Sequence, residues 1–169
     1  MKYVYQEYSS AYPAFFSVEK SHIASNISHS CEIEHIGSTA VSGLGGKPII
    51  DILIMASAKE LEGISCFLQK IGYLYRPQHS TPDHLFLKKE CKGKDLYAYH
   101  IHLCARESKN AQAFIGLRDH LKANPKETQR YAEIKKAAAI EAKGGGLCYR
   151  QRKEQFFKSL DSKLRTHFN

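Results

Sequence analysis

The sequence lacks the features of several large protein classes. Its five cysteines lie at positions 31, 66, 91, 104 and 148, and no two of them form a C-x-x-C or another zinc-ribbon spacing. An odd, scattered set is typical of reduced thiols. No stretch approaches the roughly 18 apolar residues of a membrane span, and the polar first ten residues have no signal-peptide core. We therefore expect a cytoplasmic protein with no membrane partner.

Two common nucleotide-binding motifs are missing as well. The glycine-rich run Gly43-Leu44-Gly45-Gly46-Lys47-Pro48 has Pro after its Lys, where a P-loop requires Ser or Thr. The same run is not a dinucleotide-binding fingerprint, and the chain has no internal repeat or low-complexity tract. If the protein binds a nucleotide, it does so with another kind of loop.

The composition is that of an ordinary globular domain with an uneven distribution of charge. The chain has 169 residues, of which 43% are hydrophobic and 25% charged, and its net charge is +8. Residues 118–165 alone hold 13 basic and 6 acidic side chains. This surplus either attracts an anionic partner, a nucleotide or a nucleic acid, or forms a solvated helical surface.

Hydrophobic periodicity predicts strands first and helices at the end. A helix is expected over about residues 14–27, and a second one ends at Gly72. Strands are expected over residues 31–36, 48–55, 84–91 and 96–104, the last two joined as a hairpin at Lys92-Gly93-Lys94-Asp95. The pattern predicts one α+β domain over residues 1–169, with a sheet-containing core over about 14–105 and a helical part over about 107–168.

The loop between the first two strands is the most informative stretch. Gly37 and Ser38, at the end of a strand, can present backbone N–H groups and a hydroxyl to a phosphate, because Gly permits a positive φ. Asp51 then lies in an apolar strand, where an unpaired charge costs several kcal/mol. Its partner is therefore a bound Mg²⁺ with nucleotide phosphates, Lys47, or a histidine from a neighbouring strand.

Two histidines on a later strand are candidates for the same site. His100 and His102 are two residues apart, so their side chains share a face and can reach one metal ion or one anion. The alternative is a pair of hydrogen-bonded sheet histidines. Imidazole suits zinc or manganese better than magnesium.

Four other residues have two interpretations each. Glu34 and His35 lie on opposite faces of one strand, and we expect Glu34 to line the pocket because it shares a face with Ser38. Tyr149 and Lys153, four apart on a closing helix, either cover the pocket and hold phosphate or form a surface pair.

The sequence resembles the GrpB family, small bacterial proteins regarded as members of the nucleotidyltransferase superfamily that includes DNA polymerase beta. The run Glu34–Ile54 resembles the family signature, and His100-Ile101-His102-Leu103 resembles its His-x-His strand. Segments around Leu117–Leu121 and Tyr149–Phe156 resemble its helices, and Ser42 departs from the usual Pro. The resemblance implies a nucleotidyltransferase-like small mixed β-sheet packed with helices, and a helical C-terminal region.

The resemblance also implies a site. A nucleoside triphosphate, or another phosphorylated small molecule, would lie on Gly37, Ser38 and Thr39, with Lys47 and Lys153 neutralising phosphate charge. Asp51, His100 and His102 would hold a divalent metal (Mg, Mn or Zn). Asp51 and His102 would be the catalytic residues, with His102 as a metal ligand or as the base for the hydroxyl of an unknown acceptor.

One departure from the active enzymes leaves two functions open. Active nucleotidyltransferases carry Asp-x-Asp on this strand, whereas the second position here is Leu53. The protein is therefore either a metal-dependent nucleotidyltransferase or a catalytically degenerate nucleotide- or RNA-binding module of the same fold.

Overall fold

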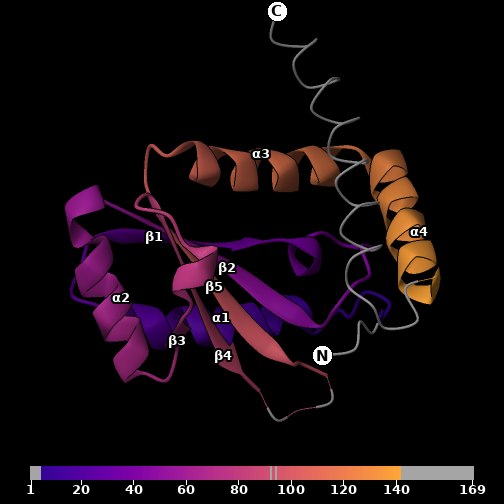
Figure 1. Cartoon of the computed structure of the whole chain (residues 1–169). Helices are drawn as coiled ribbons and strands as arrows, with labels where there is room; N and C mark the ends of the chain where they lie inside the picture. The colour runs from indigo at the N-terminus through magenta and orange to yellow at the C-terminus, as the bar shows by residue number, and fades with distance from the viewer. Residues whose placement is uncertain (1–4, 92, 94, 142–169) are drawn as a thin grey trace, which may run out of the picture.

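The computed structural model describes residues 5–91, 93 and 95–141. In chain order the elements are α1 (Tyr12–Ala24), β1 (Cys31–Ile36), β2 (Ile49–Ala56), α2 (Leu61–Lys70), β3 (Leu74–Tyr75), β4 (His84–Glu90), β5 (Ala98–Ala105), α3 (Lys109–Ala123) and α4 (Pro125–Glu141), as Figure 1 shows. The predicted α+β class is confirmed. The short strand β3, which pairs with β4, was not predicted from the sequence.

Five strands form one mixed sheet in the order β1-β2-β5-β4-β3. Strands β2 and β5 are parallel neighbours, and the other pairs are antiparallel. In this register the Cα of Asp51 lies opposite Ile36 on one side and His100 on the other. The register therefore makes Asp51 and His100 direct neighbours on one face of the sheet.

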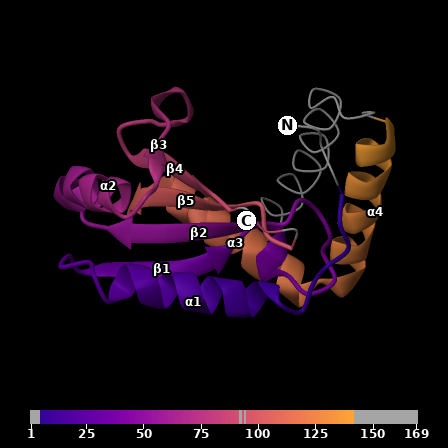
Figure 2. The same ribbon diagram turned by 90° about the horizontal axis from the view of Figure 1, so that it is seen from below.

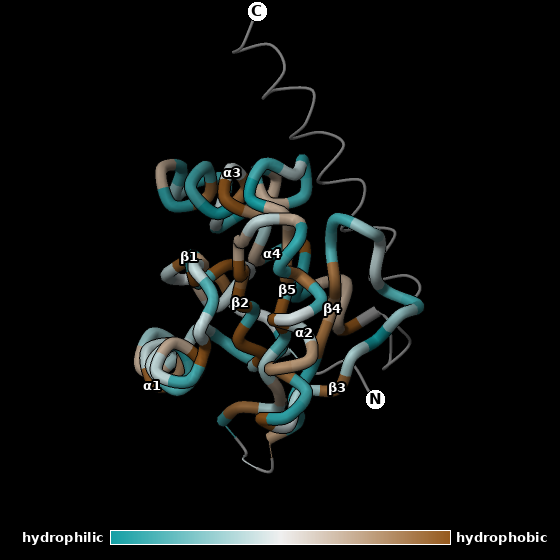
Figure 3. Tube along the Cα trace, turned by 90° about the vertical axis from the view of Figure 1, so that its left-hand side faces the viewer, coloured by the Kyte–Doolittle hydropathy of each residue, from teal (hydrophilic) through white to brown (hydrophobic). Residues whose placement is uncertain are grey.

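Helices cover both faces of this sheet. Helices α1 and α2 pack on one face, against buried residues of the central strands such as Ile52, Ile54 and Ile101. Helix α3 packs on the other face, where Leu53 and Cys104 contact its first turns. Figure 2 shows α1 running beside β1 and β2, and Figure 3, seen end-on, shows α1 and α3 on opposite sides of the strands.

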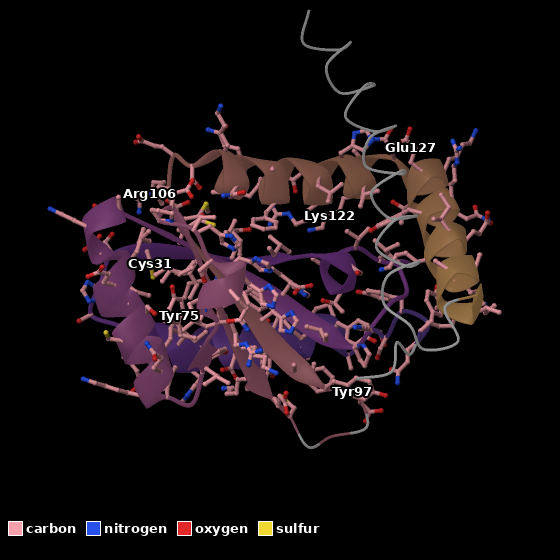
Figure 4. All side chains as sticks on the ribbon, in the orientation of Figure 1. Cys31, Tyr75, Tyr97, Arg106, Lys122 and Glu127 are labelled. Carbon is pink, nitrogen blue, oxygen red and sulfur yellow. The ribbon has the colours of Figure 1, made fainter. Side chains whose placement is uncertain are left out.

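The helix α4 turns away steeply from the end of α3, as Figure 1 shows. His120 Nε2 lies 2.7 Å from Glu127 Oε2, and the Thr128 hydroxyl donates to the carbonyl of Leu121 at 2.6 Å. Figure 4 labels Glu127 at this corner. The two helices hold the loop after β1 through a small apolar cluster of Val41, Leu44, Leu121 and Tyr131.

Several sequence predictions can be followed along the chain. Helices α3 and α4 lie within the expected helical part, and the expected closing helix lies outside the described residues. Strands β4 and β5 are antiparallel neighbours, as a hairpin requires, although Lys92 and Lys94 of the turn also lie outside the described residues.

Cysteines 31, 66, 91 and 104 are free thiols, and Cys148 is not among the described residues. No helix in the described part of the chain is long and apolar enough to cross a membrane.

Candidate functional site

A cleft of about 370 Å³ lies between the sheet and α3, next to the loop that follows β1. Its polar lining residues come from four elements: Gly37 and Ser38 from the loop, Asp51 from β2, His100 and His102 from β5, and Arg118 from α3. Aromatic and apolar side chains complete the walls, among them Phe86, Phe114, Leu117 and Tyr131. The cleft therefore brings together Gly37, Ser38, Asp51 and both predicted histidines.

The Asp51 carboxylate lies between the two histidines of β5. Its Oδ1 atom is 3.3 Å from His100 Nδ1 and 3.8 Å from His102 Nε2. Burial by itself raises the pKa of Asp51, but the hydrogen bonds and charge of the two imidazoles outweigh it and hold that pKa well below its ordinary value. Of the three partners expected for Asp51, the described residues supply the histidines.

A third histidine, His84 of β4, extends this group. Its Nε2 atom lies 3.0 Å from His102 Nδ1, and the two rings are nearly parallel at 7°. Burial, together with the charge of His102, lowers the pKa of His84. Sequence reasoning missed His84 because its neighbour is set by the register of β4 on β5, which the sequence pattern does not specify.

The loop reaches Asp51 because of Gly37. Gly37 has φ of 72°, and a Cβ atom at this position would lie 2.4 Å from Asp51 Oδ2. Only a residue without a side chain permits both this backbone conformation and this approach. The site therefore depends on a glycine that touches the central carboxylate.

The neighbouring Ser38 is held by a lysine of α4. Lys135 is 2% exposed, and its Nζ donates to Ser38 Oγ at 2.7 Å and to the carbonyl of Gly45 at 2.6 Å. Sequence reasoning did not select Lys135 as a site residue among the many lysines of this region. The spacing of Lys135 along α4 could have indicated its burial, because Tyr131, Lys135 and Ala138 form one buried stripe of this helix.

The Thr39 side chain, expected to bind phosphate, is hydrogen-bonded within the protein instead. Its side chain is buried, and its hydroxyl donates to the carbonyl of Ile49 at 3.1 Å while lying 3.0 Å from His35 Nε2. Because the hydroxyl proton goes to Ile49, the Nε2 of His35 is the donor in the second bond. The Thr39 side chain thus fixes the loop to the sheet and is not among the residues that line the cleft.

Glu34 and His35 lie on opposite faces of β1, as strand alternation requires. Glu34 Oε2 is 2.6 Å from Arg118 Nη1, and Arg118 Nε is 2.7 Å from Asp119 Oδ1. Glu34 thus faces α3 and pairs with Arg118, which lines the cleft, but Glu34 itself is not among the lining residues. His35 instead stacks on Phe16 of α1, with ring centroids 4.7 Å apart.

The remaining predicted residues are not part of the described site. Lys47 is half-buried and does not appear among the residues that line the cleft. Tyr149 and Lys153 lie outside the described residues. Their proposed contacts with phosphate stay predictions.

The donor set does not fit a resident divalent cation. Within residues 5–91, 93 and 95–141, no group of three or more His, Cys, Asp or Glu side chains is placed to hold a metal ion. Leu53, at the position of a second carboxylate, is fully buried beneath α3. Both ring nitrogens of His102 already face partners, His84 and Asp51. Asp51 with the two histidines therefore forms a cluster of polar groups that face one another.

Residues 3–163 match the family described as GrpB protein. The chain belongs to the GrpB family. It is 34% identical over 136 residues to UPF0157 protein BH1888 of Halalkalibacterium halodurans, a match that covers 79% of this chain and 67% of that protein. Three further relatives are longer, and the matching segment spans 54% or less of each.

Solved structures confirm the fold of this GrpB chain. The crystal structure of the conserved protein GrpB from Enterococcus faecalis matches with a TM-score of 0.82 and 24% identity, over 98% of this chain and all of that chain. A more distant likeness is to Cid1 in complex with its short product ApU, with a TM-score of 0.47 and 12% identity over 76% of this chain and 40% of Cid1. The Cid1 likeness is too low to carry a conclusion about function.

Proposed function

We propose that this GrpB chain binds a nucleotide, or another phosphorylated small molecule, in the cleft between the sheet and α3. The observation that carries the proposal is the Ser38 hydroxyl, which lines the cleft and is oriented from behind by the buried Lys135 ammonium. Because Ser38 Oγ accepts from Lys135, its own proton is directed elsewhere and can be donated to a phosphate oxygen.

Two cations suit an anion at Ser38. The Lys135 charge lies 2.7 Å behind the hydroxyl, and Arg118, which also pairs with Glu34 and Asp119, lines the cleft together with Asp51. The resemblance of the run Glu34–Ile54 to the GrpB signature supports a phosphate at this loop, since it implies that Gly37 and Ser38 hold the triphosphate.

The apolar walls of the cleft suit the nucleobase of such a ligand. Phe86, Phe114 and Tyr131 line the cleft, and aromatic rings are surfaces on which a nucleobase stacks. A volume of about 370 Å³ falls within the range of small-molecule sites, roughly 300–1,000 Å³. Phosphate at Ser38 and a base against the aromatic wall is the arrangement that we propose.

Calorimetric titration tests this function with a matched pair of variants. ATP, GTP, CTP and UTP are each titrated into wild type, Ser38→Ala and Ser42→Ala, first in EDTA. Ser38→Ala should weaken binding at least about tenfold, because a hydrogen bond to a charged group contributes about 1.5–3 kcal/mol. Ser42→Ala should bind like wild type, since Ser42 is an exposed residue of the same loop that does not line the cleft.

Three outcomes of this titration contradict the proposal or refine it. Wild type that binds none of the four nucleotides contradicts it, and so does equal affinity of the two variants. Repeating the titration with Mg²⁺, Mn²⁺ and Zn²⁺ tests the metal-dependent transferase predicted from the sequence. Affinity that appears only with one of these ions would show that a metal completes the site.

A further inference from the structure

The geometry points to a chemical role for this cleft that rests on the proposed binding. We propose that His100 is a base that activates a hydroxyl group, water included, to attack the phosphorus of a bound phosphate ester, and that Asp51 is its positioning residue. The reaction class is phosphoryl- or nucleotidyl-type transfer without a resident metal ion.

The His100 ring is oriented by two neighbours, Asp51 and Phe86. Asp51 Oδ1 lies 3.3 Å from Nδ1, and this negative charge favours the proton of the neutral ring on Nδ1 and the lone pair on Nε2. Phe86 packs edge-on against this ring, with centroids 5.0 Å apart at 77°, and restricts its rotation. His100 lines the cleft, and the described residues place no hydrogen-bond partner on its Nε2. This nitrogen is available to a ligand.

His102, the catalytic residue expected from the sequence, has different surroundings from His100. His102 Nδ1 lies 3.0 Å from His84, and its Nε2 lies 3.8 Å from Asp51. Phe114 packs on the same ring at 4.5 Å between centroids. With both nitrogens directed at protein partners, His102 and His84 act together as a support for Asp51, and the role of base passes to His100.

In the proposed step the hydroxyl displaces the leaving group at phosphorus. The oxygen of the attacking hydroxyl forms a bond to phosphorus while its proton passes to His100 Nε2. The bond between phosphorus and the leaving oxygen breaks, and its electron pair goes with the leaving group. Ser38, which faces the same cleft, donates a hydrogen bond to a phosphoryl oxygen as negative charge develops there.

A chromogenic nucleotide diester tests this step. Thymidine 5′-p-nitrophenyl phosphate with water yields thymidine monophosphate and p-nitrophenolate, a leaving group that needs no proton. Release of p-nitrophenolate is measured in EDTA for wild type, His100→Ala and, as control, His22→Ala, an exposed histidine of α1. His100→Ala should lower kcat on the order of 100-fold, the scale of general-base catalysis, with little change in the affinity for thymidine monophosphate. Added imidazole should restore part of the lost rate, and His22→Ala should match wild type.

Two further variants separate catalysis from folding. Asp51→Asn should lower kcat while KM changes little, because the amide no longer fixes the neutral Nδ1–H tautomer. His100→Gln fills a similar volume but cannot accept the proton, so it replaces His100→Ala if that variant does not fold.

The outcomes distinguish this inference from the proposed function. Wild type that binds thymidine monophosphate but releases no p-nitrophenolate overturns the inference and leaves the binding function standing. Full turnover by His100→Gln, or turnover only after a divalent metal is added, also overturns it. Wild type that binds neither thymidine monophosphate nor the triphosphates contradicts the proposed function itself.

Discussion

Gly37 determines both the course of the loop backbone and how closely that backbone approaches Asp51. Its φ of 72° directs the loop towards β2, and its Cα lies so close to Asp51 that any side chain would meet the carboxylate. Gly43 in the same loop has a similar φ of 78°, but a Cβ there meets nothing within 4 Å. A side chain at Gly43 would therefore meet only the cost of a positive φ, whereas a side chain at Gly37 would also clash with Asp51.

We expect Gly43→Ala to lower the free energy of unfolding by about 1 kcal/mol, the cost of an L-residue at positive φ. Gly37→Ala meets a backbone conformation that essentially only glycine adopts (φ 72°, ψ −167°) and also displaces Asp51, so it should lose clearly more, about 2–4 kcal/mol, together with ligand binding. Urea unfolding of both variants and calorimetry with the best-bound nucleotide measure these effects. Equal losses in the two variants would show that the contact between Gly37 and Asp51 is unimportant.

At the scale of elements, helix α4 holds the loop between β1 and β2 in place. Its buried Lys135 donates to Ser38 and to the Gly45 carbonyl, two points of the loop that are seven residues apart. The next residue, Lys136, pairs with Glu7 at 2.6 Å, but both of these side chains are more than half exposed. Adjacent lysines of one helix thus have opposite environments.

We expect Lys135→Met to destabilise the fold by about 2–3 kcal/mol, because it leaves the Gly45 carbonyl without its charged donor in a buried place. It should also weaken nucleotide binding, since Ser38 loses its orientation. Lys136→Met should change neither property appreciably, because exposed ion pairs contribute little. Chemical unfolding and calorimetry of the pair provide the measurement, and similar behaviour of both variants would contradict the anchoring role.

At the scale of the whole molecule, His35 connects two layers of the fold. It stacks on Phe16 of α1 and bonds to Thr39 on the loop, and it does so as a neutral ring. Burial, supported by the nearby charges of Lys122 and Arg118 and opposed by that of Asp51, lowers the pKa of His35 from 6.5 to about 4. Between these two values the unfolded chain binds a proton that the folded chain does not.

Stability should therefore fall as the pH falls from about 6.5 to about 4. A shift of this size, discounted for the partial exposure of the ring, corresponds to about 2 kcal/mol. His35→Phe keeps an aromatic ring next to Phe16 but cannot titrate, so its free energy of unfolding should decrease less over this range. Urea unfolding of both proteins at pH 7 and pH 4.5 measures the difference. Parallel losses in wild type and variant would rule out a contribution from His35.

The sequence by itself determined the elements and the main anomaly of this protein. Apolar spacing over Leu61, Ile64 and Leu68 specifies α2, and all three side chains are buried in the fold. The β-branched run around Asp51 specifies β2, and an acidic residue within such an apolar run already indicates that its carboxylate has a partner. These inferences succeed because helical and strand periodicity are local properties of a chain.

The partners within the site were decided only by the tertiary structure. Asp51 meets His100 because β5 pairs in parallel with β2 in one register, and His102 meets His84 because β4 pairs on the other side. Lys135 reaches Ser38, 97 residues away, only after α4 has turned back beside the loop. Strand order, register and helix docking depend on long-range packing of the whole core, so no local pattern in the sequence specifies which of the candidate side chains meet.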